Sequence, residues 1–269
     1  MTFKKTALEL ATIAISLTLG ACSSTSTDDV TLNNIQKNDK LVVALNPEFA
    51  PFEFKTLVDG KDTILGSDVA LAQAIADELD VELELSPMSF DNVLSSLQSG
   101  KADIAISGIS VTEERKKTFD FSNAYYQAKN VLIVKEENSA KFSTIKSLSG
   151  KNIAAQKGSV QENVIKEQIP EANLISLTSN GNMITELKSG TVDAVILEKP
   201  IAQGYILNNP GLVLSTIELD SSATDSYAVA LPKNNRTLKE KINRVVKDLV
   251  DSGKYEDYVQ EAYQANTNE

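Results

Sequence analysis

Two segments of the chain repeat one ten-residue pattern, and this pattern strongly limits the folds that the chain can adopt. Residues 97–106 are LQSGKADIAI, and residues 187–196 are LKSGTVDAVI. In each segment a helical stretch ends at a glycine, and an apolar run typical of a buried strand follows. A match this short also arises without duplication, because helix, glycine and strand often follow one another. As architecture, two such units at like places in the two halves predict α/β layering with largely parallel sheets.

Polar residues follow both predicted strands. Ser107 and Gly108 come after the first, and Glu198 and Lys199 come after the second. Ligands of open α/β sheets bind beyond the carboxyl ends of the strands. Two such edges that face each other would form a cleft between two lobes.

The lobe boundaries follow from this arrangement. We expect residues 40–128 and 227–269 in the first lobe and residues 129–226 in the second, with short extended crossings near residues 127–130 and 224–227. Apolar residues recur at helical spacing over residues 238–250, which predicts an amphipathic helix that packs on the first lobe.

The N-terminus has the layout of a signal peptide. Lys4 and Lys5 precede an apolar stretch over residues 7–19, and the sequence Leu-Gly-Ala-Cys ends at Cys22, the single cysteine. This resembles a lipobox, so we expect residues 1–21 to be removed and Cys22 to carry a lipid; an ordinary secretory signal is the alternative. Residues 22–39 are rich in Ser, Thr, Asp and Asn and are predicted to form a flexible tether.

Composition excludes several classes of function. The chain of 269 residues has a net charge of −11 and no basic cluster, which argues against nucleic-acid binding. It has no histidine and one cysteine, so the common nucleophile–base pairs and most transition-metal sites cannot form. No glycine loop has phosphate-binding spacing. We therefore expect no metal, no cofactor and no catalytic residue, although a carboxylate-based enzyme stays possible.

The residues do offer groups suited to a zwitterion. Thr112 is a plausible N-cap, and Arg115 in the following turn could bind a carboxylate in a bidentate manner. Free backbone N–H groups at Ser159 and Val160, where a strand leads into a helix, could bind the same carboxylate from the other half. Glu198 could neutralise an ammonium. The ordinary alternatives are a surface ion pair, a plain strand-to-helix turn and a helix-start carboxylate.

Four segments in order carry a resemblance: GSDVALAQAIA (66–76), FDNVLSSLQSGKAD (90–103), ISVTEER (109–115) and FDFS (119–122). They resemble the family 3 solute-binding proteins of polar amino-acid ABC importers, streptococcal members in particular, over about residues 41–259. The resemblance implies a type II periplasmic-binding-protein-like fold, with two three-layer α/β lobes joined by a two-strand hinge. It also implies a monomer that binds an amino acid between the lobes and delivers it to a membrane permease. The protein would act outside the cytoplasm, as a lipoprotein anchored to the cell membrane at a Gram-positive cell surface.

The resemblance also assigns roles to the backbone and charged groups of the site. The Arg115 side chain and the Ser110 backbone would hold the ligand carboxylate, together with the Ser159 and Val160 amides. The Gly108 carbonyl, the Ser110 hydroxyl and Glu198 would hold the ammonium, with Glu198 replacing the aspartate of many relatives. Ser107 precedes these residues at the strand end and is included in the site.

The ligand side chain would meet a different set of residues. Phe49 and Phe90 would flank it, and Asn46, Glu53 and Gln156 would line the distal end. Asn46 stands where several relatives that bind basic amino acids carry aspartate, and Glu53 could supply the missing charge or point to solvent. Arginine is the first expectation, lysine the second, and glutamine the neutral alternative.

Two other functions remain for such a chain. One is an enzyme on the same fold, similar to cyclohexadienyl dehydratase, in which a cleft carboxylate such as Glu198 would act as a general acid. The other is the sensory module of a membrane receptor, which would need a membrane-spanning segment after the domain. The intact amino-acid site favours the transport receptor.

Overall fold

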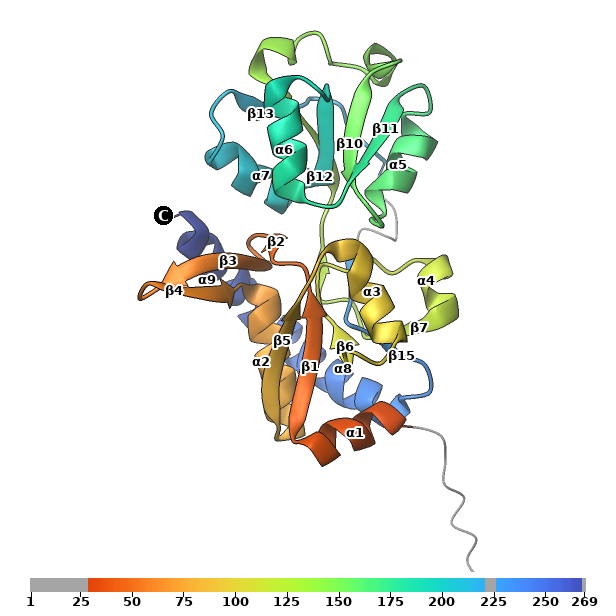
Figure 1. Cartoon of the computed structure of the whole chain (residues 1–269), viewed down its shortest axis with the longest axis vertical. Coiled ribbons are helices and arrows are strands. Elements are labelled where there is room, and N and C mark those ends of the chain that lie inside the picture. Colours follow the sequence, from red (N-terminus) through yellow and green to blue (C-terminus); the bar gives the residue numbers. More distant parts are fainter. Residues whose placement is uncertain (1–28, 221–225, 268–269) are drawn as a thin grey trace, which may run out of the picture.

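The computed structural model describes residues 29–220 and 226–267. These residues form two lobes, each built around a five-stranded sheet (Figure 1). The predicted two-lobed α/β fold is therefore confirmed.

The sheet of the first lobe has the order β5-β1-β6-β15-β7. Strands β1, β5 and β6 run parallel, and β15 is antiparallel to β6 and β7. The elements of this lobe are α1 (Val30–Asn38), β1 (Lys40–Leu45), β2 (Glu48–Phe49), β3 (Glu53–Val58), β4 (Lys61–Leu65), α2 (Ser67–Leu79), β5 (Glu82–Pro87), α3 (Phe90–Gln98), β6 (Ile104–Ala105), α4 (Glu113–Thr118), β7 (Phe119–Phe121), β15 (Ala230–Pro232), α8 (Arg236–Asp251) and α9 (Lys254–Thr267).

The sheet of the second lobe repeats this arrangement in the order β11-β10-β12-β9-β13. Strands β10, β11 and β12 are parallel, and β9 is antiparallel to β12 and β13. Its elements are β9 (Asn130–Lys135), η1 (Glu136–Asn138), η2 (Ile145–Leu148), β10 (Asn152–Gln156), α5 (Gln161–Gln168), β11 (Asn173–Leu177), α6 (Asn180–Ser189), β12 (Ala194–Glu198), α7 (Lys199–Leu207) and β13 (Leu212–Leu214).

Helices cover both faces of each sheet. Successive side chains of a strand point to opposite faces, so each strand packs against helices on both sides. In the first lobe Val43 of β1 belongs to the same apolar cluster as Leu71 of α2, and Ala44 belongs to the cluster that contains Val93 of α3. In the second lobe Ala154 and Ala155 of β10 divide in the same way between two clusters. Each lobe is thus a three-layer unit.

The sequence repeat has a direct structural meaning. Gly100 and Gly190 follow α3 and α6 with φ angles of +72° and +87°, the left-handed conformation that glycine adopts without steric cost. Asp103 Oδ2 accepts a hydrogen bond from the Val42 backbone N–H at 2.8 Å. In the second lobe Asp193 Oδ2 accepts from the Asn152 N–H at 3.0 Å. The repeat therefore places β6 beside β1 and β12 beside β10.

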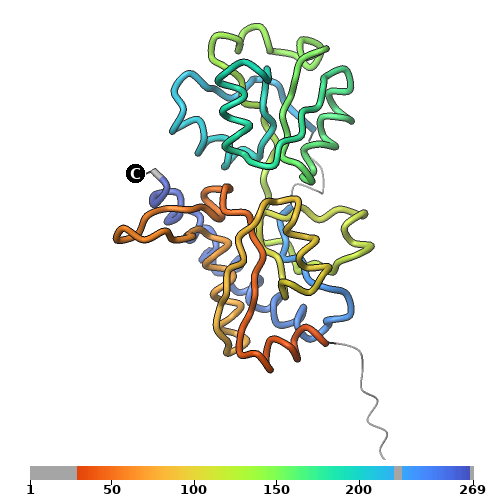
Figure 2. The backbone as a smooth tube through the Cα atoms, viewed as in Figure 1, coloured from red at the N-terminus to blue at the C-terminus, as the bar shows by residue number. Residues whose placement is uncertain are grey.

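Two crossings join the lobes (Figure 2). The strands β8 (Tyr126–Gln127) and β14 (Ser226–Tyr227) pair antiparallel at this point. The first crossing runs from β8 to β9, as predicted, while residues 224 and 225 of the second predicted crossing lie outside the described residues. Tyr126 and Tyr227 stack here with ring centroids 5.7 Å apart, and Phe52 lies edge-on to both rings.

The C-terminal helices confirm the predicted packing on the first lobe. The α8 residues Leu238, Ile242, Val246 and Leu249 are buried, and α8 contacts α2. The last helix, α9, contacts α2 and α8 and also reaches α7 in the second lobe.

The predicted tether is wrong for its last part. Residues 30–38 form α1, and its side chains Leu32 and Ile35 are buried in the core of the first lobe. The carboxylate of Asp29 accepts hydrogen bonds from the backbone N–H groups of Thr237 and Leu238. Two apolar residues three positions apart are enough to dock this short helix, which the polar composition concealed. The predicted signal peptide, Cys22 and the tether up to residue 28 lie outside the described residues.

Candidate functional site

A small pocket lies between the lobes, at the carboxyl ends of their parallel strands. Its volume is about 10 Å³, the room that one water molecule needs. We call it the interlobe pocket, and its lining residues are Phe49, Phe90, Gly108, Ser110, Arg115, Gln156, Ser159, Val160, Gln161, Leu197 and Glu198. The predicted site residues are therefore brought together, with the exceptions of Asn46, Glu53 and Ser107.

The chain after β6 forms the floor of the pocket in the first lobe. Gly108 has a φ of +53°, and a Cβ atom at this position would lie 2.4 Å from Cε1 of Phe49. Only glycine allows the loop to approach the Phe49 ring so closely. The Gly108 N–H donates to Asp68 Oδ2 at 3.1 Å, and Ser110 pairs with the hinge residue Tyr227. The loop is thus held by the hinge and by the start of α2.

Arg115 carries the positive charge of the pocket. Thr112 caps α4 as predicted, because its side chain accepts a hydrogen bond from the Arg115 backbone N–H. The guanidinium donates from Nη1 to the Ser110 carbonyl at 2.7 Å and from Nη2 to the Gly158 carbonyl of the second lobe at 3.0 Å. Its Cζ atom also lies 5.8 Å from the centre of the Phe90 ring. Arg115 therefore touches both lobes.

Burial lowers the pKa of Arg115 to about 10, although Glu114 and Glu198 act in the opposite direction. Desolvation disfavours the charged form of a buried group. A pKa near this value still leaves the guanidinium protonated at neutral pH.

The turn between β10 and α5 forms the wall of the second lobe. The backbone N–H of Ser159 donates to the Gln156 carbonyl at 3.1 Å. The prediction of a free N–H at Ser159 is therefore wrong in this conformation, because the turn closes on itself. The Ser159 Oγ atom is buried and has no hydrogen-bond partner among the described residues. Buried polar atoms are usually paired, so this hydroxyl is available to a ligand.

Glu198 supplies the negative charge. It ends β12 and takes the N-cap position of α7, where the next residues are Lys199 and Pro200. The residue is 6% exposed. Its charge raises the pKa of Arg115 in the opposite lobe. The pocket therefore contains one buried anion and one cation that face it from different lobes.

Asn46 and Gln156 close one end of the pocket. Gln156 Nε2 donates to Asn46 Oδ1 at 2.9 Å, and Asn46 Nδ2 donates to the Met88 carbonyl at 3.0 Å. Asn46 itself lines a neighbouring cavity of about 320 Å³, which extends along the cleft past Met88 to Thr178. The amide pair thus separates the interlobe pocket from a larger space.

Ser107 lies beneath the pocket and joins Asn46 to Glu53. Its Oγ accepts from the Asn46 N–H at 2.9 Å and donates to Glu53 Oε1 at 2.6 Å. Ser107 therefore holds neighbouring groups in place and does not line the pocket.

Glu53 lies in neither of the predicted positions. Its side chain is 0% exposed, and it lies within the first lobe near Ser107 and Asp68 instead of in the pocket or in solvent. Burial raises its pKa well above the ordinary value, and the Asp68 carboxylate raises it further. As a carboxylate, its Oε2 atom would have no hydrogen-bond partner among the described residues. The raised pKa favours the protonated form of Glu53, and its burial within the first lobe keeps it away from the ligand.

Asp68 is the partner of Glu53 in this buried acid pair. Its carboxylate accepts hydrogen bonds from Tyr125 Oη at 2.8 Å, Tyr255 Oη at 2.7 Å and the Gly108 N–H. Burial raises the pKa of Asp68, while these donors and Glu53 oppose the rise. In the sequence, Glu53 and Asp68 look like an ordinary loop residue and an ordinary helix-start residue. Their burial could not be predicted, because it depends on the packing of α9, which lies far away in the chain.

The sequence did not indicate several residues at the lobe contact. Gln161 and Leu197 line the interlobe pocket, and Lys157 Nζ lies 3.1 Å from Asp91 Oδ2 across the cleft. Gln161 directly follows the predicted turn, and Leu197 directly precedes Glu198, so proximity to the predicted site was the available signal. No local pattern indicates the contact of Lys157 with Asp91.

Within the described part of the chain, no three His, Cys, Asp or Glu side chains are grouped so that they could hold a metal ion. Over the same residues, no helix combines the length and hydrophobicity of a membrane-spanning segment.

Comparison with known proteins gives consistent matches. Residues 41–265 match the family described as bacterial extracellular solute-binding proteins, family 3. An arginine-binding extracellular protein, ArtP, of Bacillus subtilis is 32% identical over 94% of this chain and 95% of its own. The ABC transporter glutamine-binding protein GlnH of the same species is 30% identical over 88% of this chain and 86% of its own.

A solved structure is more similar still. It is that of an amino acid ABC transporter substrate-binding protein, AbpA, from Streptococcus pneumoniae bound to L-arginine. It has a TM-score of 0.85 and 52% sequence identity and covers 87% of this chain and 99% of its own.

Proposed function

The chain belongs to family 3 of the bacterial extracellular solute-binding proteins, and we propose from this membership and from its site that it is the substrate-binding component of an amino-acid ABC importer. It takes up an amino acid between its lobes and delivers it to the permease. Its role is that of a transport receptor and not of an enzyme.

One observation carries this proposal: Arg115 and Glu198 face the same pocket from opposite lobes. An amino acid carries a carboxylate and an ammonium on one carbon atom, so it needs a cation and an anion a short distance apart. Arg115 can bind the carboxylate with a two-pronged, charge-assisted contact. Glu198 can bind the ammonium, and the unpartnered Ser159 hydroxyl adds a further polar contact.

Binding requires the lobes to move. The interlobe pocket is too small for an amino acid, and the Arg115 guanidinium is bonded to backbone carbonyls of Ser110 and Gly158. A ligand carboxylate would replace these contacts when it enters. Opening about the β8 and β14 crossings, followed by closure on the ligand, is the hinge motion that such an arrangement supports.

Arginine is the favoured ligand. Phe49 and Phe90 present aromatic faces on which a guanidinium can stack. The similar pneumococcal protein was solved with L-arginine bound. Glu53 does not contribute to this preference, because it is buried within the first lobe and does not line the pocket. Because the Asn46 and Gln156 amides are neutral, glutamine stays the alternative ligand. Lysine ranks between arginine and glutamine.

We propose further that the protein acts as a monomer outside the cytoplasm, attached to the cell membrane by a lipid on Cys22. The signal-peptide layout before this cysteine supports the proposal. A Gram-positive cell surface fits it, since the pneumococcal protein is the relative with 52% identity.

Calorimetric titration of the purified protein with arginine, lysine, glutamine and glutamate tests the function. We expect the tightest binding for arginine, followed by lysine and glutamine. A thermal-shift screen with all twenty amino acids extends the test, because a ligand that binds only the folded state raises the melting temperature. Absence of a shift with every amino acid would contradict the proposal.

A further inference from the structure

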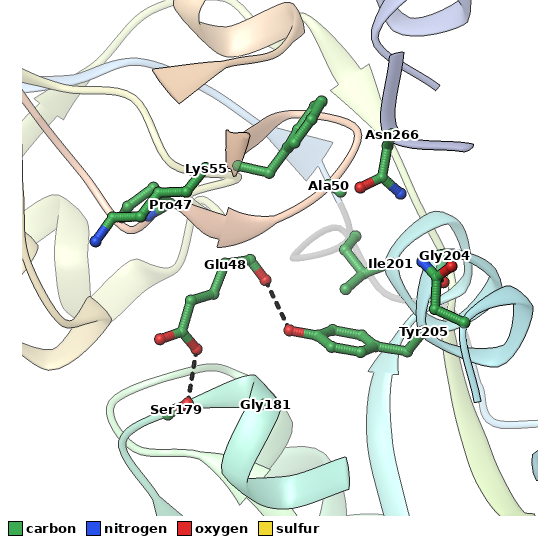
Figure 3. Close-up of a pocket in the computed structure, with 12 residues that line it drawn as sticks. Pro47, Glu48, Ala50, Lys55, Ser179, Gly181, Ile201, Gly204, Tyr205 and Asn266 are labelled. Carbon is green, nitrogen blue, oxygen red and sulfur yellow. Dashed lines mark hydrogen bonds between the residues drawn. The ribbon is translucent and has the colours of Figure 1, made fainter. Parts of the chain in front are cut away.

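A second cavity lies at the edge of the lobe contact, apart from the interlobe pocket. Its volume is about 360 Å³, and different residues line it, among them Glu48, Ala50 and Phe54 of the first lobe and Ser179, Ile201 and Tyr205 of the second (Figure 3). We call it the outer cavity. Glu48 extends from its wall toward the second lobe.

The local structure separates Glu48 from the ligand. Glu48 and Phe49 are the two residues of β2, and neighbouring side chains of a strand point to opposite sides. Phe49 lines the interlobe pocket, whereas Glu48 lines the outer cavity and the neighbouring cavity beside Asn46. Glu48 therefore does not line the interlobe pocket.

Instead, Glu48 binds the start of a helix in the other lobe. Its Oε2 atom accepts hydrogen bonds from Ser179 Oγ at 2.8 Å and from the Asn180 backbone N–H at 2.9 Å. Its carbonyl oxygen accepts from Asn180 Nδ2 and from Tyr205 Oη, both at 3.2 Å. Figure 3 shows the Glu48 carboxylate pointing to Ser179, the N-cap of α6, and the Glu48 carbonyl pointing to Tyr205 of α7.

The helix lacks such a carboxylate of its own. The first turn of α6 contains no acidic residue, although the amino end of a helix favours negative charge. Ser179 caps this end by accepting from the Asn182 N–H, and its hydroxyl proton is then free to be donated to Glu48. Glu48 completes the cap from the opposite lobe.

We propose that Glu48 is a positioning residue that latches the two lobes in the closed arrangement and so strengthens ligand binding without touching the ligand. This inference rests on the proposed function. All four contacts join the first lobe to the second, so opening about the hinge breaks them together. The apparent affinity of a binding protein that closes on its ligand rises with the population of the closed state.

The test compares Glu48→Ala with Glu48→Gln, which keeps an acceptor oxygen and loses the charge. The matched control is Glu82→Ala, because Glu82 is an exposed acid at the amino end of β5 and its removal changes the net charge equally. For arginine, calorimetry should give a dissociation constant about tenfold higher for Glu48→Ala and about threefold higher for Glu48→Gln. The control should match the wild type.

Selectivity separates a latch from a ligand contact. If Glu48 acts only through closure, the ratios of the dissociation constants for arginine, lysine and glutamine stay at their wild-type values in Glu48→Ala. The combined Glu48→Ala and Ser179→Ala variant should then lose less affinity than the product of the two single losses, because each change removes the same hydrogen bond between Ser179 Oγ and Glu48 Oε2. Altered ratios, or an affinity within twofold of the wild type, would overturn the latch.

X-ray scattering distinguishes failure of the latch from failure of the function. Without ligand, Glu48→Ala should have a larger radius of gyration than the wild type, which indicates a more open population. If the wild type binds no amino acid, the proposed function fails, and the scattering comparison alone decides the latch. An unchanged radius in that case would overturn it.

Discussion

Gln156 in the second lobe donates a hydrogen bond from Nε2 to Oδ1 of Asn46 in the first lobe at 2.9 Å. This amide pair closes the end of the interlobe pocket at which the side chain of an amino acid would lie. Both groups are neutral, so the chain has an acceptor but no charge at this end. The relationship makes Asn46 the residue at which a single change should alter ligand preference.

Asn46→Asp should therefore shift the preference toward basic amino acids. The new carboxylate can still accept from Gln156, but it loses the hydrogen bond to the Met88 carbonyl and places a charge near that oxygen. A cationic ligand offsets this cost, whereas a neutral one does not. We expect the ratio of arginine to glutamine affinity to rise about tenfold by calorimetric titration. An equal gain for both ligands would contradict a position of Asn46 beside the side chain.

Arg115→Ala should abolish amino-acid binding while the protein stays folded. Removing one partner of a buried charge pair costs about 3–5 kcal/mol, which corresponds to a loss of at least about 100-fold in affinity. Circular dichroism checks the fold, and calorimetry measures the binding. Lys116→Ala is the control, since Lys116 lies next in the chain and is paired with Glu113 on the surface. Binding of Arg115→Ala within threefold of the wild type would mean that Arg115 has no part in the site.

Glu198→Gln should weaken binding by about tenfold, because the ammonium keeps an acceptor oxygen and loses the opposite charge. The variant separates the ammonium contact from the carboxylate contact. It should lower the affinity for every amino acid by a similar factor in titration, since all of them share the ammonium. A loss confined to basic ligands would assign Glu198 to the side chain instead.

Glu53→Gln should remove part of the pH dependence of stability. The folded protein holds a proton on Glu53 at pH values where the unfolded chain has lost it, since the folded pKa lies well above the ordinary value of 4.5. Unfolding then releases a proton, and the free energy of unfolding falls as the pH rises from about 4.5 toward the folded pKa, by at most about 1.4 kcal/mol per pH unit. A glutamine cannot ionise, and its amide can donate to Asp68 in place of the proton.

The stability difference between Glu53→Gln and the wild type should thus grow in favour of the variant from pH 5 to pH 8. Denaturant unfolding at several pH values measures it, and Glu137→Gln, a change at an exposed acid, should show no such trend. A difference that stays constant with pH would show that Glu53 is ionised in the folded protein.

Cys22→Ala should release the protein from the membrane fraction, since the thiol that would carry the lipid is absent. Fractionation of producing cells, followed by immunoblotting, measures the distribution. A wild-type protein that stays soluble with residues 1–21 attached would contradict lipid anchoring.

The sequence alone determined the features that depend on neighbouring residues. Glycine after a helical stretch, an N-cap threonine and short apolar runs act within a few residues, so they located α3, β6, α6, β12 and the turn that begins with Thr112. These elements place Gly108, Arg115 and Glu198 at the edges of two sheets. The charged groups of the proposed zwitterion site could be predicted because each of them follows a local signal.

Only the tertiary structure decided how residues far apart in the sequence meet. Glu53 is buried because Ser107, Asp68 and the helix α9 that carries Tyr255 close around the start of β3, and burial raises its pKa. Glu48 caps α6 because the second lobe lies against β2, which no pattern around residue 48 indicates. Pairing, desolvation and charge depend on the distance between groups in space, and that distance is fixed only when the lobes pack.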